Sequence, residues 1–139
     1  MPDLDAYLFF DGDCAEAMRF YERTLGGKLE AMMTHADAPP GMPSPPNMAD
    51  RIMHARLALG SRVLMASDAM AGQPYNAMKG FSLSLGYATA DEARRIFDAM
   101  AAGGQTTMPM QKTFWAEAFG MLIDRFGTPW MVSGGMASQ

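Results

Sequence analysis

The sequence is poor in the residues that build disulfides and metal sites. It has one cysteine, Cys14, and two histidines among 139 residues. A single cysteine excludes an internal disulfide and any metal site that needs several cysteines. Cys14 lies at the expected start of a helix, where a thiol can become a nucleophile. A small buried residue next to the helix cap is the interpretation that we favour.

Long apolar runs and clusters of basic residues are also missing. No segment approaches the roughly 18 apolar residues that a membrane-spanning helix needs, and the opening MPDLDAYLFF lacks the basic start of an export signal. Eleven Lys and Arg against fifteen Asp and Glu give a net charge of −4, and the basic residues are scattered. We therefore expect a cytoplasmic protein that binds neither nucleic acid nor membrane.

One stretch of the sequence occurs twice. DCAEAMRFYERTLGGK at 13–28 is echoed 76 positions later by TADEARRIFDAMAAGGQ at 89–105. The glycine pair at 26–27 returns at 103–104, after one inserted residue. Each copy follows a strand-like apolar run and precedes three more. The duplication predicts two βαβββ modules in a single domain over 1–139.

Apolar spacing within each copy supports this order of elements. Ala17, Phe20, Tyr21 and Leu25 recur at helical spacing, and a glycine pair is typical of a helix end. We expect an α+β fold with module one at about 4–68, module two at about 80–135, helices outside and curved mixed sheets around a cavity. The expected helices are 15–25 and 91–102, and the expected strands are 6–10, 28–34, 52–59, 62–67, 81–87, 105–110, 116–124 and 129–133.

Proline and methionine are the abundant residues. Residues 35–50 carry five of the nine prolines, which lack the amide hydrogen that a central strand needs. We expect a long loop there, either a cover over the cavity or an excursion without function. The sixteen methionines either line an adaptable apolar cavity or replace Leu and Ile in the core.

With this duplication, the sequence resembles the PhnB-like branch of the vicinal oxygen chelate superfamily, which includes glyoxalase I, bleomycin-binding resistance proteins, fosfomycin-modifying enzymes and extradiol dioxygenases. The resemblance covers nearly the whole chain. It is carried by YLFFDGDCAEAMRFYERTLGG (7–27), HARLALGSRVLMASDAM (54–70), GFSLSL (80–85), FWAEAFG (114–120) and DRFGTPWM (124–131). It also implies a homodimer, since members of the superfamily commonly pair their sheets.

The resemblance further implies where a metal would be held. Counting back from the first helix places one ligand position at Ala6, and the repeat offset places its partner at Ser82. The positions on the last strand of each half match Met65 and Met131. Alanine cannot bind a metal, and thioether sulfur suits cuprous copper rather than zinc, nickel, manganese or iron. We therefore expect no metal and no other cofactor, and no reaction in which a metal polarises substrate oxygens.

Two groups of side chains are candidates for chemistry. His54 and Arg56 share one face of their strand, where His54 could act as a general base and Arg56 could hold an anion. Trp115, Glu117 and Phe119 also share a face and could grip a flat or cationic ligand, with Glu117 as a second acid–base group. The alternatives are a solvated polar pair and ordinary core packing beside an exposed glutamate.

Four further residues are candidate ligand contacts. Ser82 and Ser84 fall on the expected cavity face and could donate hydrogen bonds, although small residues there could simply leave room. Met65 and Met131 occupy two of the implied metal positions and would add apolar surface.

The turn before the last strand contains two residues with expected structural roles. Asp124, followed by Arg125, predicts an ion pair that stabilises the turn. Trp130 is expected to pack beneath a helix.

Three functions stay open at this point. The first is a metal-independent protein that binds a small molecule in the cavity between the modules. The second is an enzyme with a reassigned acid–base site, in which His54 works with Glu117 or Arg56 on a small oxygenated substrate. The third is a non-catalytic regulatory or interaction protein.

Overall fold

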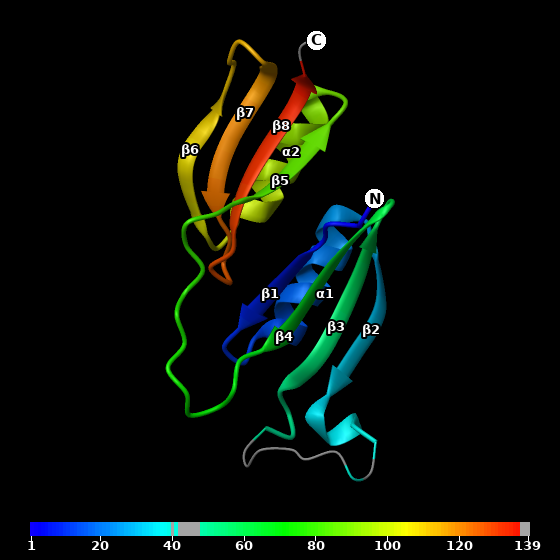
Figure 1. Ribbon diagram of the computed structural model, residues 1–139. Coiled ribbons are helices and arrows are strands. Elements are labelled where there is room, and N and C mark those ends of the chain that lie inside the picture. The colour runs from blue at the N-terminus through cyan, green and yellow to red at the C-terminus, as the bar shows by residue number, and fades with distance from the viewer. Residues whose placement is uncertain (40, 42–47, 137–139) are drawn as a thin grey trace. The chain divides into compact units, whose positions relative to one another are not determined.

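A computed structural model describes residues 1–39, 41 and 48–136 (Figure 1). It divides into two compact units, Met1–Tyr75 and Asn76–Gln139. Each unit contains a four-stranded sheet and one long helix.

The first unit begins with a strand and a helix and then adds three strands. Its elements are β1 (Ala6–Phe10), α1 (Cys14–Leu25), β2 (Lys28–Thr34), the 3-10 turn η1 (His35–Asp37), β3 (Ile52–Leu59) and β4 (Arg62–Asp68). The strand order is β1-β4-β3-β2. Only the β1–β4 pair is parallel.

The second unit repeats this plan. Its elements are β5 (Leu83–Tyr87), α2 (Ala90–Ala101), β6 (Gln105–Gln111), β7 (Ala116–Ile123) and β8 (Pro129–Met136). The strand order is β5-β8-β7-β6, with the β5–β8 pair parallel. The expected α+β fold of two βαβββ modules is therefore confirmed, and each sheet is open rather than closed into a barrel.

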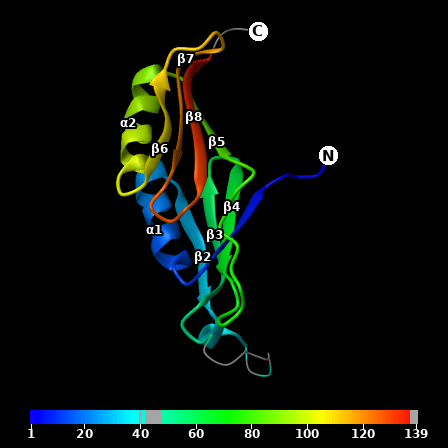
Figure 2. The same cartoon turned by 90° about the vertical axis from the view of Figure 1, so that its left-hand side faces the viewer.

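Each helix lies against one face of its own sheet and leaves the other face open (Figure 2). In the first unit, Leu8 and Phe10 alternate inward from β1 and are 3% and 0% exposed, whereas Tyr7 and Phe9 alternate outward. The same alternation buries Trp130 and Val132 of β8. The open faces are therefore where functional side chains are to be sought.

The repeated glycine pairs have a structural explanation. Gly26 takes a left-handed conformation (φ 81°) and ends α1. A β-carbon on Gly27 would collide with the carbonyl oxygen of Ala58, so only a glycine fits at the position just before β2. Gly103 and Gly104 repeat both features in the second unit.

The largest differences from the expected strand boundaries lie in the second unit. β5 begins at Leu83 rather than 81, and β8 continues to Met136 rather than ending at 133. β6 contains Pro109, which the ladder tolerates because β6 is an edge strand.

The proline-rich segment is only partly described. It opens with η1, where the Thr34 hydroxyl accepts from the Asp37 amide and the Asp37 carboxylate accepts from the Thr34 amide. Residues 40 and 42–47 lie outside the described part of the chain. The expected cover over a cavity stays a prediction.

Candidate functional site

Strand register decides which side chains share the open face of the first sheet. Tyr7 of β1 pairs with Met65 of β4, and Met65 pairs with Arg56 of β3. These residues form one row across three strands, on the face away from α1.

Ala6 lies on the opposite face. It pairs with Leu64, which is 4% exposed and faces the helix. Two ligands of one metal must lie on the same face, so Ala6 cannot share a site with Met65 and its assignment as a metal position is wrong. Tyr7 occupies that place instead, because a slip of one residue moves a side chain to the other face of a strand.

Tyr7 and His54 are joined across the sheet. β4 lies between β1 and β3, so the Tyr7 ring reaches over β4 to approach His54. Its hydroxyl is 3.2 Å from the His54 Nδ1, and the two ring centroids are 5.8 Å apart in a stacked arrangement. Phe9 continues this aromatic surface, with its centroid 5.2 Å from that of Tyr7. Tyr7 and Phe9 remain 39% and 56% exposed.

Arg56 is held at the edge of this aromatic surface. Its Nε donates to the Glu30 Oε1 at 2.9 Å, and its Nη1 lies 4.0 Å from the Met65 sulfur. Glu30 lies at an irregularity in the β2–β3 register, between Leu29 and Ala31. The ion pair orients the guanidinium and leaves its two terminal nitrogens available to hold an anion.

Tyr75, at the C-terminal end of the first unit, holds the backbone of β1. The Tyr75 hydroxyl donates to the carbonyl oxygen of Phe9 at 2.7 Å. Burial raises the pKa of the Tyr75 phenol, and the nearby carboxylates of Asp13, Asp11 and Asp68 raise it further. Tyr75 therefore stays a hydrogen-bond donor and fixes the backbone from which Phe9 projects.

Asp68 connects the loops at one end of the first sheet. It is 6% exposed, and its Oδ1 accepts from the amides of Gly12 and Cys14 at 2.9 and 3.0 Å. Its Oδ2 accepts from the amide of Ile52 at 2.8 Å. One buried carboxylate thus joins the β1–α1 loop to the start of β3, the strand that carries His54 and Arg56.

Cys14 is a buried structural residue. It is 0% exposed. Burial raises the pKa of its thiol to about 12, and the carboxylates of Asp68 and Asp13 add to the effect. A thiol with such a pKa stays protonated near neutral pH, so Cys14 is not an activated nucleophile.

The open face of the second sheet is built differently. Ser84 pairs with Met131, and Met131 pairs with Met121. Ser82 has the same parity as Ser84 but precedes β5. The row therefore offers one hydroxyl and two thioethers.

The aromatic residues expected to cluster in the second unit do so. The Trp115 ring contacts Phe119 edge to face with centroids 5.3 Å apart, and it contacts Phe114 at 4.7 Å. Phe119 is 7% exposed, whereas Phe114 is 91% exposed. Glu117 is exposed on the same strand. His54 and Arg56 share the open face of β3. Glu117 belongs to the other unit, so the structure does not join it to this pair.

The turn before β8 is organised by Asp124. Its Oδ1 accepts from the amides of Phe126 and Thr128, and its Oδ2 accepts from the Trp130 indole at 2.8 Å. Arg125 donates through Nε to the carbonyl oxygen of Ala102. Asp124 therefore stabilises the turn through backbone amides and a buried tryptophan, and the expected ion pair with Arg125 stays a prediction.

The residues that the structure describes contain no group of three or more His, Cys, Asp or Glu side chains that could hold a metal ion. The open-face row of the first unit offers Tyr7 and Met65, and that of the second offers Ser84 and Met131. None of these four side chains is an imidazole or a carboxylate, so neither row fits zinc, nickel, manganese or iron, and His54 is the one imidazole that the described residues place on the face of the first row.

Comparison of the sequence with models of protein families identifies the family of this chain. The Glyoxalase/Bleomycin resistance protein/Dioxygenase superfamily matches residues 3–132. The chain belongs to this superfamily. Protein YjdN of Escherichia coli K12 is 37% identical over 138 residues, which cover 94% of this chain and 93% of YjdN.

Solved structures agree with the superfamily assignment. Protein PA1353 from Pseudomonas aeruginosa superposes with a TM-score of 0.90 at 46% identity, covering 99% of this chain and 100% of that one. The PhnB protein from Bacillus cereus superposes with a TM-score of 0.78 at 22% identity, covering 96% of this chain and 100% of that one. The resemblance seen in the sequence is thereby confirmed, the PhnB likeness at the level of the fold. No helix within the described part of this superfamily member is long and apolar enough to cross a membrane.

Proposed function

We propose that this protein binds a small molecule on the open face of the first sheet, without the metal that other members of the superfamily use. The observation that supports this proposal most strongly is the row of Tyr7, Met65 and Arg56, with Tyr7 joined to His54. Aromatic, thioether and guanidinium groups there take the place of metal ligands.

The surface favours a ligand with a flat apolar body and an anionic group. Tyr7 and Phe9 present partly exposed rings, against which an aromatic ligand would stack. Arg56 lies at the border of these rings with its Nε already bound to Glu30, so an incoming carboxylate or phosphate would meet the two terminal nitrogens. This binding surface is formed by side chains of the first unit alone.

A thermal-shift screen of aromatic carboxylates on chelator-treated protein tests this proposal. A ligand present at 100 times its Kd stabilises the folded protein by about 2.7 kcal/mol. Tyr7→Ala and Arg56→Gln should each reduce the shift, whereas Arg62→Gln should preserve it. Arg62 is the matched control, since it is an exposed arginine on the adjacent strand of the same sheet. Equal shifts in all three variants would contradict the proposed site.

Acid–base catalysis is the second candidate function. The Tyr7 hydroxyl engages the Nδ1 of His54, which leaves Nε2 to exchange a proton with a small oxygenated substrate. His54→Gln should then abolish turnover and leave binding largely intact, and unchanged turnover in this variant would refute the catalytic role. Pairing with Arg56 is favoured over pairing with Glu117, because Arg56 shares the face with His54.

The remaining expectations stay part of the proposal. Ser82, Ser84, Trp115, Phe119 and Met131 are proposed ligand contacts on the second unit. The third candidate, a regulatory or interaction protein, would leave the ligand screen without hits. Assembly as a homodimer is proposed as well, and sedimentation equilibrium at several protein concentrations would measure it.

A further inference from the structure

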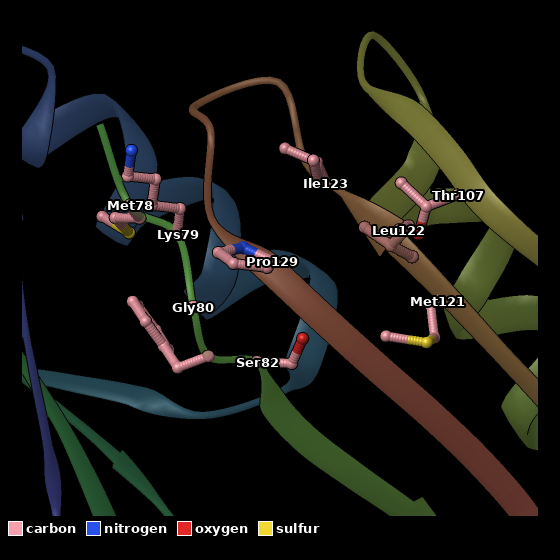
Figure 3. A pocket seen from close by; sticks show the side chains of 10 residues that line it. Met78, Lys79, Gly80, Ser82, Thr107, Met121, Leu122, Ile123 and Pro129 are labelled. Atoms are coloured by element: carbon pink, nitrogen blue, oxygen red, sulfur yellow. The ribbon is translucent and has the colours of Figure 1, made fainter. Parts of the chain in front are cut away.

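A hollow lies entirely within the Asn76–Gln139 unit and includes no residue of the face that carries Tyr7 and His54. Its volume is about 250 Å³. One side is formed by the connector residues 78–82, just before β5 begins, and the other by β6, β7 and the start of β8 (Figure 3). Figure 3 shows Met78, Lys79 and Ser82 along the connector, and Thr107 and Met121 on the strands opposite.

The walls of this hollow are apolar and suit an aromatic ring. Met78 and Met121 contribute thioether groups, and Phe81 contributes a ring that is 45% exposed. Methionine sulfur makes favourable contacts with aromatic ring edges, and an exposed phenylalanine favours edge-to-face or offset stacking. The volume is slightly below the roughly 300 Å³ at which pockets for drug-sized ligands begin, so the space suits a single substituted ring.

The polar groups at this hollow all lack partners within the described part of the chain. The hydroxyls of Ser82 and Thr107 line it, and Lys79 lies on the connector at its border. The structure shows no hydrogen bond or ion pair from these three side chains to the described residues. Lys79 is the only charged residue in the lining. An anionic group is the complement of this set, because two hydroxyls can donate hydrogen bonds to it while the ammonium supplies the opposite charge.

We infer that this hollow is a binding site for a small monocyclic aromatic anion. The ring packs against the methionine and phenylalanine side chains of the lining, its carboxylate accepts a hydrogen bond from a lining hydroxyl, and Lys79 supplies the opposite charge at the border. The site is independent of the binding surface proposed on the first sheet, because it shares no residue with the open face of the first unit.

Methionine methyl groups provide a direct reporter. Protein labelled with ¹³C at the methionine methyls is titrated with 4-fluorobenzoate, and the signals of Met78 and Met121 are compared with that of Met65. Met65 lies on the open face of the first sheet and reports binding at that other site. The inference predicts shifts of Met78 and Met121 at millimolar probe. Unmoved Met78 and Met121 signals would overturn it, whatever Met65 does.

Two variants test the location of the site. Thr107→Trp places a large side chain from the exposed edge strand β6 into the hollow and should abolish the shifts. Thr106→Trp is the matched control, because Thr106 is also exposed on β6 but does not line the hollow. Thermal melting establishes that both variants fold. Shifts that persist in Thr107→Trp would overturn the inference.

A third variant tests the charge. Lys79→Gln should raise the Kd for 4-fluorobenzoate about two- to fivefold, the range expected for an exposed ion pair. The Kd for neutral 4-fluorobenzamide should not change, and Lys112→Gln should leave both values unaltered. Equal affinity for 4-fluorobenzoate and cationic 4-fluorobenzylamine would refute an anion site.

Discussion

Replacing Asp68 by asparagine should destabilise the first unit strongly. The carboxylate is buried and accepts three backbone hydrogen bonds, two through Oδ1 and one through Oδ2. Asparagine has a single side-chain oxygen, so it can keep the bonds to Gly12 and Cys14 but must turn its amide group toward the amide of Ile52. The variant Asp68→Asn therefore leaves one buried donor facing another.

The magnitude follows from this count. Loss of a hydrogen bond to a charged group costs about 1.5–3 kcal/mol, and an unsatisfied buried amide costs about 1–3 kcal/mol. Both figures describe the loss of the same hydrogen bond to the Ile52 amide, so they cannot simply be added. We expect a net loss of roughly 3 kcal/mol in the free energy of unfolding, and a melting temperature lower by about 10 °C for a chain of this size.

Urea unfolding followed by far-UV circular dichroism measures the loss. Trp115 and Trp130 both lie in the second unit, so tryptophan fluorescence would not report on the first. Asp98→Asn is the control, because it removes the same charge from an exposed position on α2 and should change stability by less than about 0.5 kcal/mol. If Asp68→Asn were as stable as this control, the role assigned to Asp68 would be refuted.

Three further predictions concern buried groups. Cys14 should react with a thiol reagent at pH 8 only as fast as the protein unfolds, and rapid labelling of the native protein would contradict its burial. The pKa of its thiol is raised from 9.0 to about 12 in the folded state. The contribution of this thiol to the stability of the folded protein should therefore fall as pH rises from about 9 to about 12. Gly27→Ala should destabilise by at least about 1–3 kcal/mol in thermal melts, since the new methyl group would meet the Ala58 carbonyl; an unchanged melting temperature would argue against that close approach. Trp130→Phe should cost about 1.5–3 kcal/mol or more in urea unfolding, because the Asp124 carboxylate loses its indole donor, and a loss below about 0.5 kcal/mol would contradict this account.

The fold could be predicted from the sequence because the helices and the glycine pairs occur twice. Helical spacing such as that of Ala17 and Phe20 locates the helices to within a residue or two of α1 and α2. Each glycine pair combines a left-handed residue with one that tolerates close backbone approach. Both requirements are local, so they are visible in one sequence.

The candidate site was harder to predict because it depends on register. β1 and α1 are separated by residues 11–13, whereas β5 and α2 are separated by only 88–89. The repeat offset of the helices therefore does not apply to the strands before them. Counting back from α1 led to Ala6, which faces the helix, and missed Tyr7, which faces outward. Phe9 and Glu30 were missed as well; alternation along β1 could have identified Phe9, but the irregular pairing that places Glu30 beside Arg56 has no signal in the sequence.

The most direct test of metal-independent function is a thermal melt of chelator-treated protein with zinc, nickel, manganese or ferrous iron added in turn. We predict no stoichiometric metal in the purified protein and no change in melting temperature with any of these ions, since Tyr7, Met65, Ser84 and Met131 supply no imidazole or carboxylate. One equivalent of bound metal, or a rise of several degrees with one ion, would contradict the account and redirect the search to metal-dependent reactions.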